Sequence, residues 1–362
     1  MYNSVIGNLY LTLDGGRILC YHIHINFKTE GSYQMKAILI REDENRSLIW
    51  ADVPDPVCGE DDCIVIIEAC GVNRADLLQR AGDYPPPPGC PDWMGLEIAG
   101  TIVEMGSGAA EKSRWKIGDK VCALLGGGGY AEYANVKYDM LMPVPDGCSM
   151  TEAAAIPEAF ATAYLNLVYE GQGKAGETLL MNAGASGLAS VVIPMAKALG
   201  MRVITTVRKA HQVEAIAHLG ADRIVNTSEE DIAAVLKEEL DAGHGVDLAI
   251  DCLGGEVMGK CLPHLNRGAR WIMIAALAGQ LTEVDLKNIY VRGIRIIGST
   301  LRSRAPEVKA ALLAELTEKI FPLIRSGEVK PTVCAVYPIT EAEDAQKMMT
   351  DGRQVGKIVL TV

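Results

Sequence analysis

The stretch "TLLMNAGASGLASVVIPMAKALGMRVITTV", residues 178–207, decides the fold of this chain. Its start, residues 178–183, is a short apolar run that predicts a buried strand, and the GASG that follows at 184–187 predicts a turn. Apolar residues with helical spacing then run over 188–200 to a glycine, a common helix stop, and 202–207 predicts another strand. Strand, helix and strand in this order predict a βαβ unit.

The same alternation continues after this unit. Two further helices are predicted, at 210–219 and 229–240. The predicted strands between and after them cover 223–226, 246–254, 270–277 and 294–301. Strands separated by helices build a parallel, doubly wound sheet, so we expect an α/β fold. Before residue 150 the chain has short strand-like runs with many Gly and Pro residues, which predicts a mainly β domain in front.

Length, charge and composition exclude several classes of protein. With 362 residues the chain is long for one compact core, which favours two domains. The formal net charge of -12 opposes binding to phosphate backbones, so we expect no nucleic-acid partner. No window approaches the roughly 20 apolar residues of a membrane span, so we expect no membrane partner. The ten cysteines are scattered without a C-x-x-C pair, which predicts reduced thiols in a cytoplasmic protein.

The first 34 residues lack the basic start, continuous apolar core and small-residue cleavage site of a secretory signal. Met35 begins the strand-like stretch MKAILI. We therefore expect the first domain to begin at Met35, and residues 1–34 to be an extension of unknown status.

The loop between the first strand and the helix of the βαβ unit consists of Gly184, Ala185, Ser186, Gly187 and Leu188. Backbone N–H groups at a helix start can cradle a pyrophosphate, and dinucleotide-binding folds place a glycine-rich turn there. Ser186 replaces the glycine that permits close approach, so the motif by itself also fits an ordinary turn. Its place in the βαβ unit favours nucleotide binding.

The residues after the second strand of this unit indicate which nucleotide is bound. An acidic side chain roughly 20 residues after the loop would hold the ribose 2′-hydroxyl of NAD. The chain instead has Thr206, Arg208 and Lys209 there. A guanidinium pairs with a 2′-phosphate, which a carboxylate would repel, so we expect NADPH as the cofactor. In the alternative reading, Arg208 and Lys209 form only the solvated start of the next helix.

The first half of the chain offers few ligands for a metal ion. No histidine lies between residues 25 and 210, and no cysteine cluster has the spacing of a structural zinc site. This excludes His-dependent metal sites and Ser-His-Asp triads from most of that half. We therefore expect no metal.

Several stretches, in this order, carry a resemblance to a known family: GVNRADLLQRAGDYPPPPG, GLEIAGTIVEMG, KIGDKVCALLGGGGYAEYA, AFATAYLNL, GASGL, DCLGG, GSTLRSR and GKIVL. From Met35 to Val362 the chain resembles the zinc-free quinone oxidoreductases, the zeta-crystallin-like branch of the medium-chain dehydrogenase/reductase superfamily, and within it the tumour-suppressor-inducible type. The resemblance implies a GroES-like catalytic domain over 35–157, a Rossmann NADPH-binding domain over 158–300, and a return to the catalytic domain over 301–362. It also implies a homodimer or homotetramer.

The resemblance also interprets the segment around Asn73. Zinc alcohol dehydrogenases of this superfamily place a cysteine ligand at the position of Asn73 and a His-Glu pair at Leu96–Glu97. Without these ligands the resemblance implies metal-free reduction of quinones, which are already electrophiles. Glu97 is then expected to be hydrogen-bonded or ion-paired, since an isolated buried carboxylate is unfavourable.

By family position we expect catalytic roles for three residues. Asn73 would donate to the substrate carbonyl, Tyr84 would be a donor or a stacking wall, and Asp76 would brace them. The expected neighbours of the cofactor, besides the loop and the residues after the second strand, are Thr162, Ala275, Leu277 and Arg302. Simpler roles compete, with Asn73 as the cap of a helix over 74–81, Tyr84 as a packing residue and Arg302 as a surface charge.

Two other functions stay open. Zinc-free relatives reduce activated alkenes with a tyrosine in the Tyr84 region as the proton donor, which makes an enone the alternative small-molecule substrate. Other members of the branch are nucleotide-binding or structural proteins with weak turnover. The residues identify neither the quinone nor the number of electrons transferred in one step.

Overall fold

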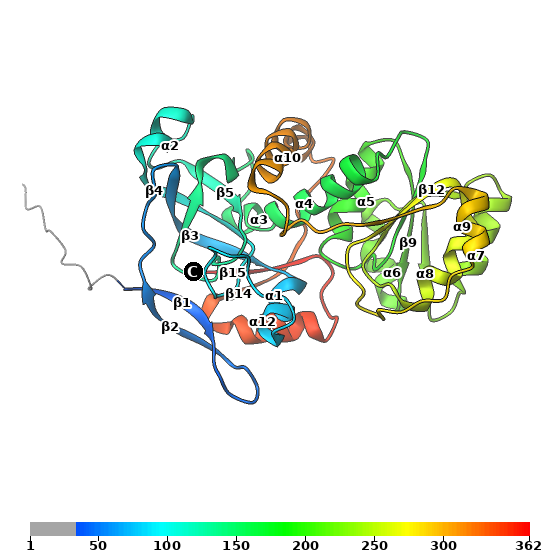
Figure 1. Ribbon diagram of the computed structural model, residues 1–362, viewed down its shortest axis with the longest axis horizontal. Helices are drawn as coiled ribbons and strands as arrows, with labels where there is room; N and C mark the ends of the chain where they lie inside the picture. The colour runs from blue at the N-terminus through cyan, green and yellow to red at the C-terminus, as the bar shows by residue number, and fades with distance from the viewer. Residues whose placement is uncertain (1–33) are drawn as a thin grey trace, which may run out of the picture. The chain divides into compact units, whose positions relative to one another are not determined.

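The computed structural model describes residues 34–362 (Figure 1). The expectation that residues 1–34 form an extension lies, apart from Gln34, outside the described residues. In the described part, β-strands form a six-stranded, a seven-stranded and a two-stranded sheet.

The six-stranded sheet is parallel, with the strand order β10-β9-β8-β11-β12-β13. Its strands are β8 (Thr178–Met181), β9 (Arg202–Val207), β10 (Arg223–Asn226), β11 (Val246–Asp251), β12 (Leu265–Met273) and β13 (Arg295–Gly298). The helices between them are α5 (Ala189–Ala198), α6 (Ala210–Ile216), α7 (Ile232–Asp241), α8 (Gly255–Cys261) and α9 (Leu286–Arg292). Strand order reverses between β8 and β11, and a crevice opens at the carboxyl ends of strands at such a point. This confirms the predicted doubly wound α/β fold.

Burial explains why the strands of this sheet are predicted by continuous apolar runs. Leu179, Val203, Ile250 and Trp271 are each 0% exposed. In a parallel sheet, helices cover both faces, so side chains on both faces of a central strand must be apolar.

The seven-stranded sheet organises the other half of the described chain. Its strand order is β14-β15-β3-β4-β5-β7, and β6 also pairs with β3. The strands are β3 (Asp62–Val72), β4 (Glu97–Met105), β5 (Lys120–Leu124), β6 (Tyr133–Lys137), β7 (Leu141–Pro143), β14 (Val333–Pro338) and β15 (Lys357–Thr361), and the separate pair is β1 (Gln34–Ile40) with β2 (Leu48–Pro54). Strand β15 pairs with β3 in antiparallel direction. Segments that precede and segments that follow the six-stranded sheet in the sequence therefore belong to one sheet. The expected domain boundaries at 157 and 300 stay predictions.

Helix α4 (Pro157–Tyr164) connects the two halves (Figure 1). It contacts β4 and β5 on one side and α5 on the other. Pro157 occupies the first turn of α4. A backbone N–H there would have no acceptor within the helix, so the helix loses no hydrogen bond by having proline at this position. The remaining helices of this half are α1 (Arg74–Ala81), α2 (Ser107–Lys112), α3 (Met150–Ala153), α10 (Pro306–Lys319), α11 (Phe321–Ser326) and α12 (Ala342–Thr350).

Helices α7 and α8 differ from the sequence predictions for identifiable reasons, and α9 was not predicted either. The helix predicted over 229–240 begins only at Ile232, because the Asp231 side chain caps it by accepting from the N–H of Ala233. Helix α8 was not predicted, since Gly255 and Gly259 are poor helix formers.

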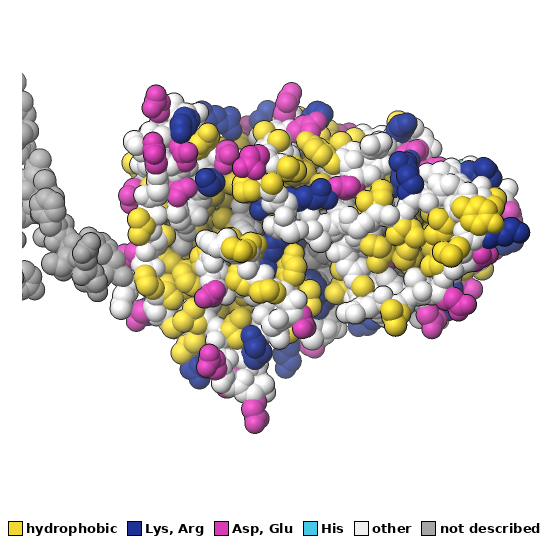
Figure 2. Space-filling view, in the orientation of Figure 1, with side chains coloured by type: hydrophobic (Ala, Val, Ile, Leu, Met, Phe, Trp, Pro, Cys, Tyr) yellow, Lys and Arg dark blue, Asp and Glu magenta, His cyan; other side chains and the backbone are white. Residues whose placement is uncertain are grey.

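No helix within residues 34–362 is long and apolar enough to cross a membrane. Acidic and basic side chains are interspersed on the face seen in Figure 2, without a continuous basic surface. The cytoplasmic location stays a prediction.

Candidate functional site

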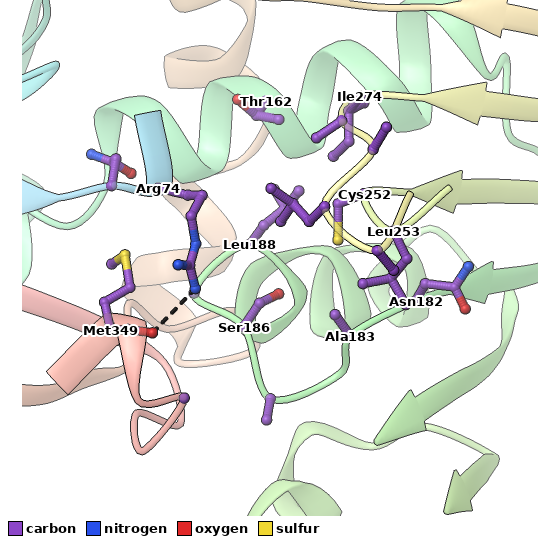
Figure 3. Close-up of a pocket in the computed structure, with 18 of the residues that line it drawn as sticks. Arg74, Thr162, Asn182, Ala183, Ser186, Leu188, Cys252, Leu253, Ile274 and Met349 are labelled. Carbon is purple, nitrogen blue, oxygen red and sulfur yellow. Dashed lines mark hydrogen bonds between the residues drawn. The ribbon is translucent and has the colours of Figure 1, made fainter. Parts of the chain in front are cut away.

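A cleft of about 1420 Å³ opens at the carboxyl ends of the parallel strands. Its lining includes Asn182 and Ala183 after β8, and Cys252 and Leu253 after β11 (Figure 3). The cleft therefore lies at the point where strand order reverses. Residues from α1, α4 and β15 also line it, so both halves of the described chain contribute.

The loop between β8 and α5 brings the start of that helix to the cleft. The loop residues that line the cleft are Ala185, Ser186, Gly187 and Leu188. A Cβ on Gly184 would lie 2.5 Å from Thr205 Oγ1, and one on Gly187 would lie 2.8 Å from Lys357 Cδ, so close packing requires both glycines. N–H groups at a helix start have no partner within the helix, which makes this loop suited to an anion.

The end of β9 forms another wall of the cleft. Thr206 Oγ1 donates to Asn182 Oδ1 (3.2 Å) and accepts from the N–H of Ala183 (3.2 Å), so its hydroxyl fixes the neighbouring loop. Arg208 is exposed at the rim, with its guanidinium 3.8 Å from the place where a Cβ on Gly352 would lie. A cation is therefore available where the sequence predicts the 2′-phosphate.

Arg74, which the sequence analysis did not assign to the site, reaches from α1 into the cleft (Figure 3). Its guanidinium donates to the carbonyl oxygen of Met349 (3.1 Å). Burial lowers the pKa of Arg74, and the positive charge of Arg208 acts in the same direction. Neither arginine forms an ion pair with a residue of the described chain, so the two cations favour an anionic ligand.

Three buried polar atoms of the cleft lining have no hydrogen-bond partner among residues 34–362, and one of them is Gln354 Oε1. The other two are Asn166 Oδ1 and Ser299 Oγ. Asn166 is 1% exposed and donates from Nδ2 to the carbonyl oxygen of Thr162 (2.8 Å), which fixes its orientation. An unpartnered buried polar atom is unfavourable, so these two indicate contact with a ligand group that both donates and accepts, such as a carboxamide.

A buried cluster of charges lies beside the cleft, where the start of α1 meets β4 and β15. Lys357 Nζ is 2.5 Å from Glu97 Oε1 and 2.6 Å from Asn73 Oδ1. Glu97 Oε2 accepts from the backbone N–H of Glu158 (2.8 Å). The Lys357 and Glu97 side chains are 4% and 0% exposed. The expected pairing of Glu97 is thus confirmed, with a partner that the sequence did not identify.

Asn73 organises this charged cluster. Its Nδ2 donates to Glu97 Oε1 (2.9 Å) and lies 3.4 Å from the carbonyl oxygen of Gly71, while its Oδ1 accepts from Lys357. Asn73 is also the N-cap residue of α1, and its backbone N–H donates to the Asp76 carboxylate (2.7 Å). Its expected role as a donor to the substrate carbonyl stays a prediction.

Asp76 lies in the same wall. Its carboxylate accepts from the N–H groups of Asn73 (2.7 Å) and Gly95 (3.1 Å) and from the Tyr130 hydroxyl (3.1 Å). Burial raises the pKa of Asp76 to about 6, against the effect of these hydrogen bonds. The side chain lies behind the cleft lining.

Tyr84 and Arg302 line the cleft together. The Arg302 guanidinium lies 4.9 Å from the centre of the Tyr84 ring and donates to the carbonyl oxygens of Tyr84 (3.2 Å) and Gly126 (2.8 Å) and to Gln79 Oε1 (2.8 Å). These contacts use three of its five N–H groups and fix the Tyr84 loop, and the expected place of Arg302 beside the cofactor stays a prediction. Burial raises the pKa of Tyr84, which keeps its hydroxyl a donor.

Glu158 also lines the cleft, one turn before Thr162 on α4. Its carboxyl group forms no hydrogen bond with the described residues. Burial, and next the negative charge of Glu97, raise the pKa of Glu158 to about 8. An un-ionised acid therefore faces the cleft at neutral pH.

Comparisons with known proteins agree with this architecture. A family profile described as alcohol dehydrogenase GroES-like domain matches residues 59–146, and one described as zinc-binding dehydrogenase matches residues 187–318. The chain is 30% identical over 300 residues to the quinone oxidoreductase-like protein 2 homolog of Nematostella vectensis, which covers 82% of this chain and 80% of that protein. The chain belongs to the medium-chain dehydrogenase/reductase superfamily.

Relatives of this medium-chain reductase differ in the reactions that their names imply. The solved structure of Escherichia coli quinone oxidoreductase complexed with NADPH matches with a TM-score of 0.79 and 27% identity, over 91% of this chain and 100% of that one. Polyketide synthase GfsB of Streptomyces halstedii is 30% identical over 315 residues, which cover 86% of this chain and 5% of that protein. The resemblance to quinone oxidoreductases drawn from the sequence is confirmed.

The residues of this medium-chain reductase do not fit the zinc ion that one profile name implies. At the two positions where the resemblance would place a cysteine and a histidine ligand, this chain has Asn73 and Leu96. The Lys357 ammonium lies against oxygens of Asn73 and Glu97, where it would repel a second cation. In the part of the chain that the structure describes, no three His, Cys, Asp or Glu residues are grouped to hold a metal ion.

The structure brings most of the predicted site residues into the one cleft. Those that line it are Asn73, Tyr84, Thr162, Ala185, Ser186, Gly187, Leu188, Thr206, Arg208, Ala275, Leu277 and Arg302. Asp76 and Gly184 lie behind this lining. Lys209 is exposed outside it, in the position before α6, so the reading of Lys209 as a solvated helix start fits better than cofactor contact.

Sequence reasoning missed many residues of the cleft. Among the polar ones are Arg74, Glu158, Asn166, Ser299 and Lys357. A signal existed for two of them, because Glu158 in IPEAF and Lys357 in GKIVL are ionisable residues within apolar runs, where a buried partner or a function is expected.

Proposed function

We propose that this chain catalyses the NADPH-dependent reduction of quinones by hydride transfer, without a metal ion. The observation that carries the proposal is the composition of the cleft. One part offers a helix start and the unpaired Arg74 and Arg208, which suit an anionic dinucleotide. Another part offers the un-ionised donors Tyr84 and Glu158. The quinone oxidoreductase of E. coli, solved with NADPH, supports the choice of cofactor.

The residues of the cleft fit this cofactor. NADPH, when bound, supplies a hydride from its nicotinamide ring. The loop of residues 185–188 and Arg74 would hold the pyrophosphate, and Arg208 the 2′-phosphate. Asn166 Oδ1 and Ser299 Oγ would then gain the partners that they lack, from the carboxamide.

The reaction requires few catalytic groups besides the cofactor, because a quinone is already an electrophile. The Tyr84 hydroxyl donates a hydrogen bond to the quinone oxygen on which negative charge develops. Arg302 fixes the loop that carries this hydroxyl, and the apolar side chains of Leu96 and Ala159 limit the access of water.

The experiment that tests the proposal is steady-state NADPH oxidation with a panel of quinones and a panel of enones. We expect saturable turnover of quinones by protein that contains no stoichiometric metal. Binding of NADPH without turnover of either panel would contradict the proposal and favour a nucleotide-binding structural protein.

Reduction of an enone is the second candidate function. It differs chemically in that a carbon atom must be protonated, so it needs a positioned acid. Two acids, Tyr84 and Glu158, face the cleft. This observation supports enone reduction as a second candidate function. Turnover of the enone panel with higher kcat/KM than the quinone panel would make it the main activity.

Arg208 should decide the preference for NADPH. A partly exposed charge-assisted pair with the 2′-phosphate contributes on the order of 1.5–3 kcal/mol, so we expect a roughly tenfold to hundredfold tighter binding of NADPH than of NADH. The Gln212 side chain adds less, because it carries no charge, although its Oε1 accepts from the N–H groups of Arg208 and Lys209 and so lies near them. Arg208→Ala should weaken NADPH binding and leave NADH binding unchanged.

The measurement is the dissociation constant of each nucleotide, by quenching of intrinsic fluorescence. Arg267→Ala, at an exposed position outside the cleft lining, is the matched control and should change neither constant. Equal affinities of the wild type for both nucleotides would contradict the assignment.

A second copy of this chain is the partner that we propose for strand β13. This strand lies at the edge of the six-stranded sheet, and Ile296 on it is 45% exposed. Leu286 and Tyr290 on α9 are both 72% exposed, and Figure 2 shows hydrophobic side chains on this part of the surface. An uncovered edge with apolar neighbours favours pairing between copies. Light scattering should give the mass of a dimer or tetramer, and a monomer at micromolar concentration would contradict this.

A further inference from the structure

Glu158, which is half-buried, differs from the two fully buried carboxyl groups of this region. Glu97 and Asp76 each accept hydrogen bonds from protein donors. The carboxyl of Glu158 accepts none from residues 34–362, although its own backbone N–H is held by Glu97. The first turn of α4 is therefore fixed in place while its acid group is left free in the cleft.

The position of Glu158 places this acid beside the expected reaction centre. Glu158 and Thr162 are four residues apart on α4 and both line the cleft, so they lie on one face of the helix, about 6 Å apart along its axis. Tyr84 and Arg302 line the same cleft, and their charges and that of Glu158 influence one another. The acid thus shares one cleft with the residue expected beside the nicotinamide and with Tyr84.

We propose that Glu158 is the proton donor that completes the reduction, delivering its proton to the substrate after the hydride has been accepted. This rests on the proposed function. In an enone, the β carbon accepts the hydride with its electron pair, and the electrons of the C=C bond move to form an enolate. The Glu158 O–H bond then breaks as the α carbon takes the proton. In a quinone the oxyanion takes it, and the carboxylate regains a proton from water.

The charges around Glu158 support the presence of this proton at neutral pH. Burial raises its pKa most, and the carboxylates of Glu97 on β4 and Asp76 on α1 raise it further. Lys357 on β15 and Arg302 act in the opposite direction, and Lys309 on α10 also faces it. The result is a pKa of about 8. Glu158 is then protonated at pH 7, and its pKa is close enough to this pH for the carboxyl group to donate its proton readily.

Tyr84 is the competing donor, and acidity separates the two. Burial raises the pKa of Tyr84 above its usual value of 10, whereas that of Glu158 is about 8. A general acid works best when its pKa lies near the working pH. Tyr84 therefore orients the substrate oxygen by a hydrogen bond, and Glu158 delivers the proton.

The test compares Glu158→Gln with the wild type on a cyclohexenone that carries a methyl group on the α carbon. Gln keeps the size of the side chain and has no acidic proton. We expect kcat to fall roughly hundredfold, as for loss of a general acid, with the dissociation constant of NADPH unchanged. We also expect a product of mixed configuration at the α carbon, because water then protonates either face. Glu318→Gln, at an exposed position on α10, is the matched control.

The configuration of the product is the readout that a structural role would not change. A single configuration made by Glu158→Gln at the wild-type rate would overturn the proposal, even if the enzyme reduces both panels. Wild-type protein that reduces neither panel would overturn the proposed function and this proposal together.

If the wild type reduces only quinones, the pH profile of kcat decides. The acid form is the active one, so wild-type kcat should stay level at neutral pH and fall as the pH passes about 8, where Glu158 loses its proton. Glu158→Gln should start lower and lack this fall. The same alkaline fall in both proteins would overturn the proposal.

Discussion

Replacing Lys357 with methionine is expected to lower the free energy of unfolding by about 3–5 kcal/mol, because it leaves a buried charge without a partner. The Glu97 side chain is fully buried, and Lys357 is its ion-pair partner at 2.5 Å. Methionine fills a similar volume, so the change removes the charge more than the packing. Urea unfolding followed by circular dichroism measures the difference.

A second substitution separates the ion pair from other effects. In the Lys357→Met background, Glu97→Gln removes the stranded charge and should recover part of the lost stability. The matched control is Lys319→Met, which breaks the exposed pair with Glu315 and should change the free energy of unfolding far less. If Lys357→Met costs no more than this control, the buried cluster does not have the role described.

Arg302→Ala is expected to lower kcat/KM for a quinone roughly tenfold to hundredfold while leaving the dissociation constant of NADPH unchanged. The lost hydrogen bonds to Tyr84, Gly126 and Gln79 are charge-assisted and worth about 1.5–3 kcal/mol each, and the Tyr84 loop relies on them for its position. Steady-state kinetics and nucleotide titration measure the two effects separately.

Arg302→Lys should not restore activity, because an ammonium cannot reach three acceptors in the directions of a guanidinium. Arg325→Ala, which breaks an exposed pair with Asp146, is the control and should leave both quantities unchanged. Loss of NADPH affinity in Arg302→Ala, in parallel with kcat/KM, would instead place Arg302 at the cofactor, as the sequence had indicated.

The parts of the site that are local in sequence were predictable. The strand, loop and helix at 178–198 follow one another, so periodicity and the glycines at 184 and 187 indicate a nucleotide loop without knowledge of distant contacts. The absence of an acidic residue after β9 is likewise visible in the sequence. The requirement that Glu97 be paired followed from the energetics of burying a charge.

The parts that depend on contacts between distant segments were not predictable. Lys357 and Asn73 are hydrogen-bonded although 284 residues separate them in the sequence. No local sequence feature near either residue indicates its partner. The Nδ2 donors of Asn73 likewise look free until Glu97, 24 residues away, is placed beside them. The pKa of Glu158 is raised mainly because the fold withdraws its carboxyl group from water, and next because Glu97 on β4 lies near it.

The late place of Lys357 in the sequence has a consequence for the order of folding during synthesis. Asn73 and Glu97 leave the ribosome long before Lys357, and Glu97 has no cation beside it until β15 joins β3. The six-stranded sheet, with its strands between residues 178 and 298, can assemble earlier as a unit. The nascent protein therefore acquires its nucleotide-binding half first, and the half that holds Tyr84 and Glu158 becomes complete only when synthesis has passed residue 361.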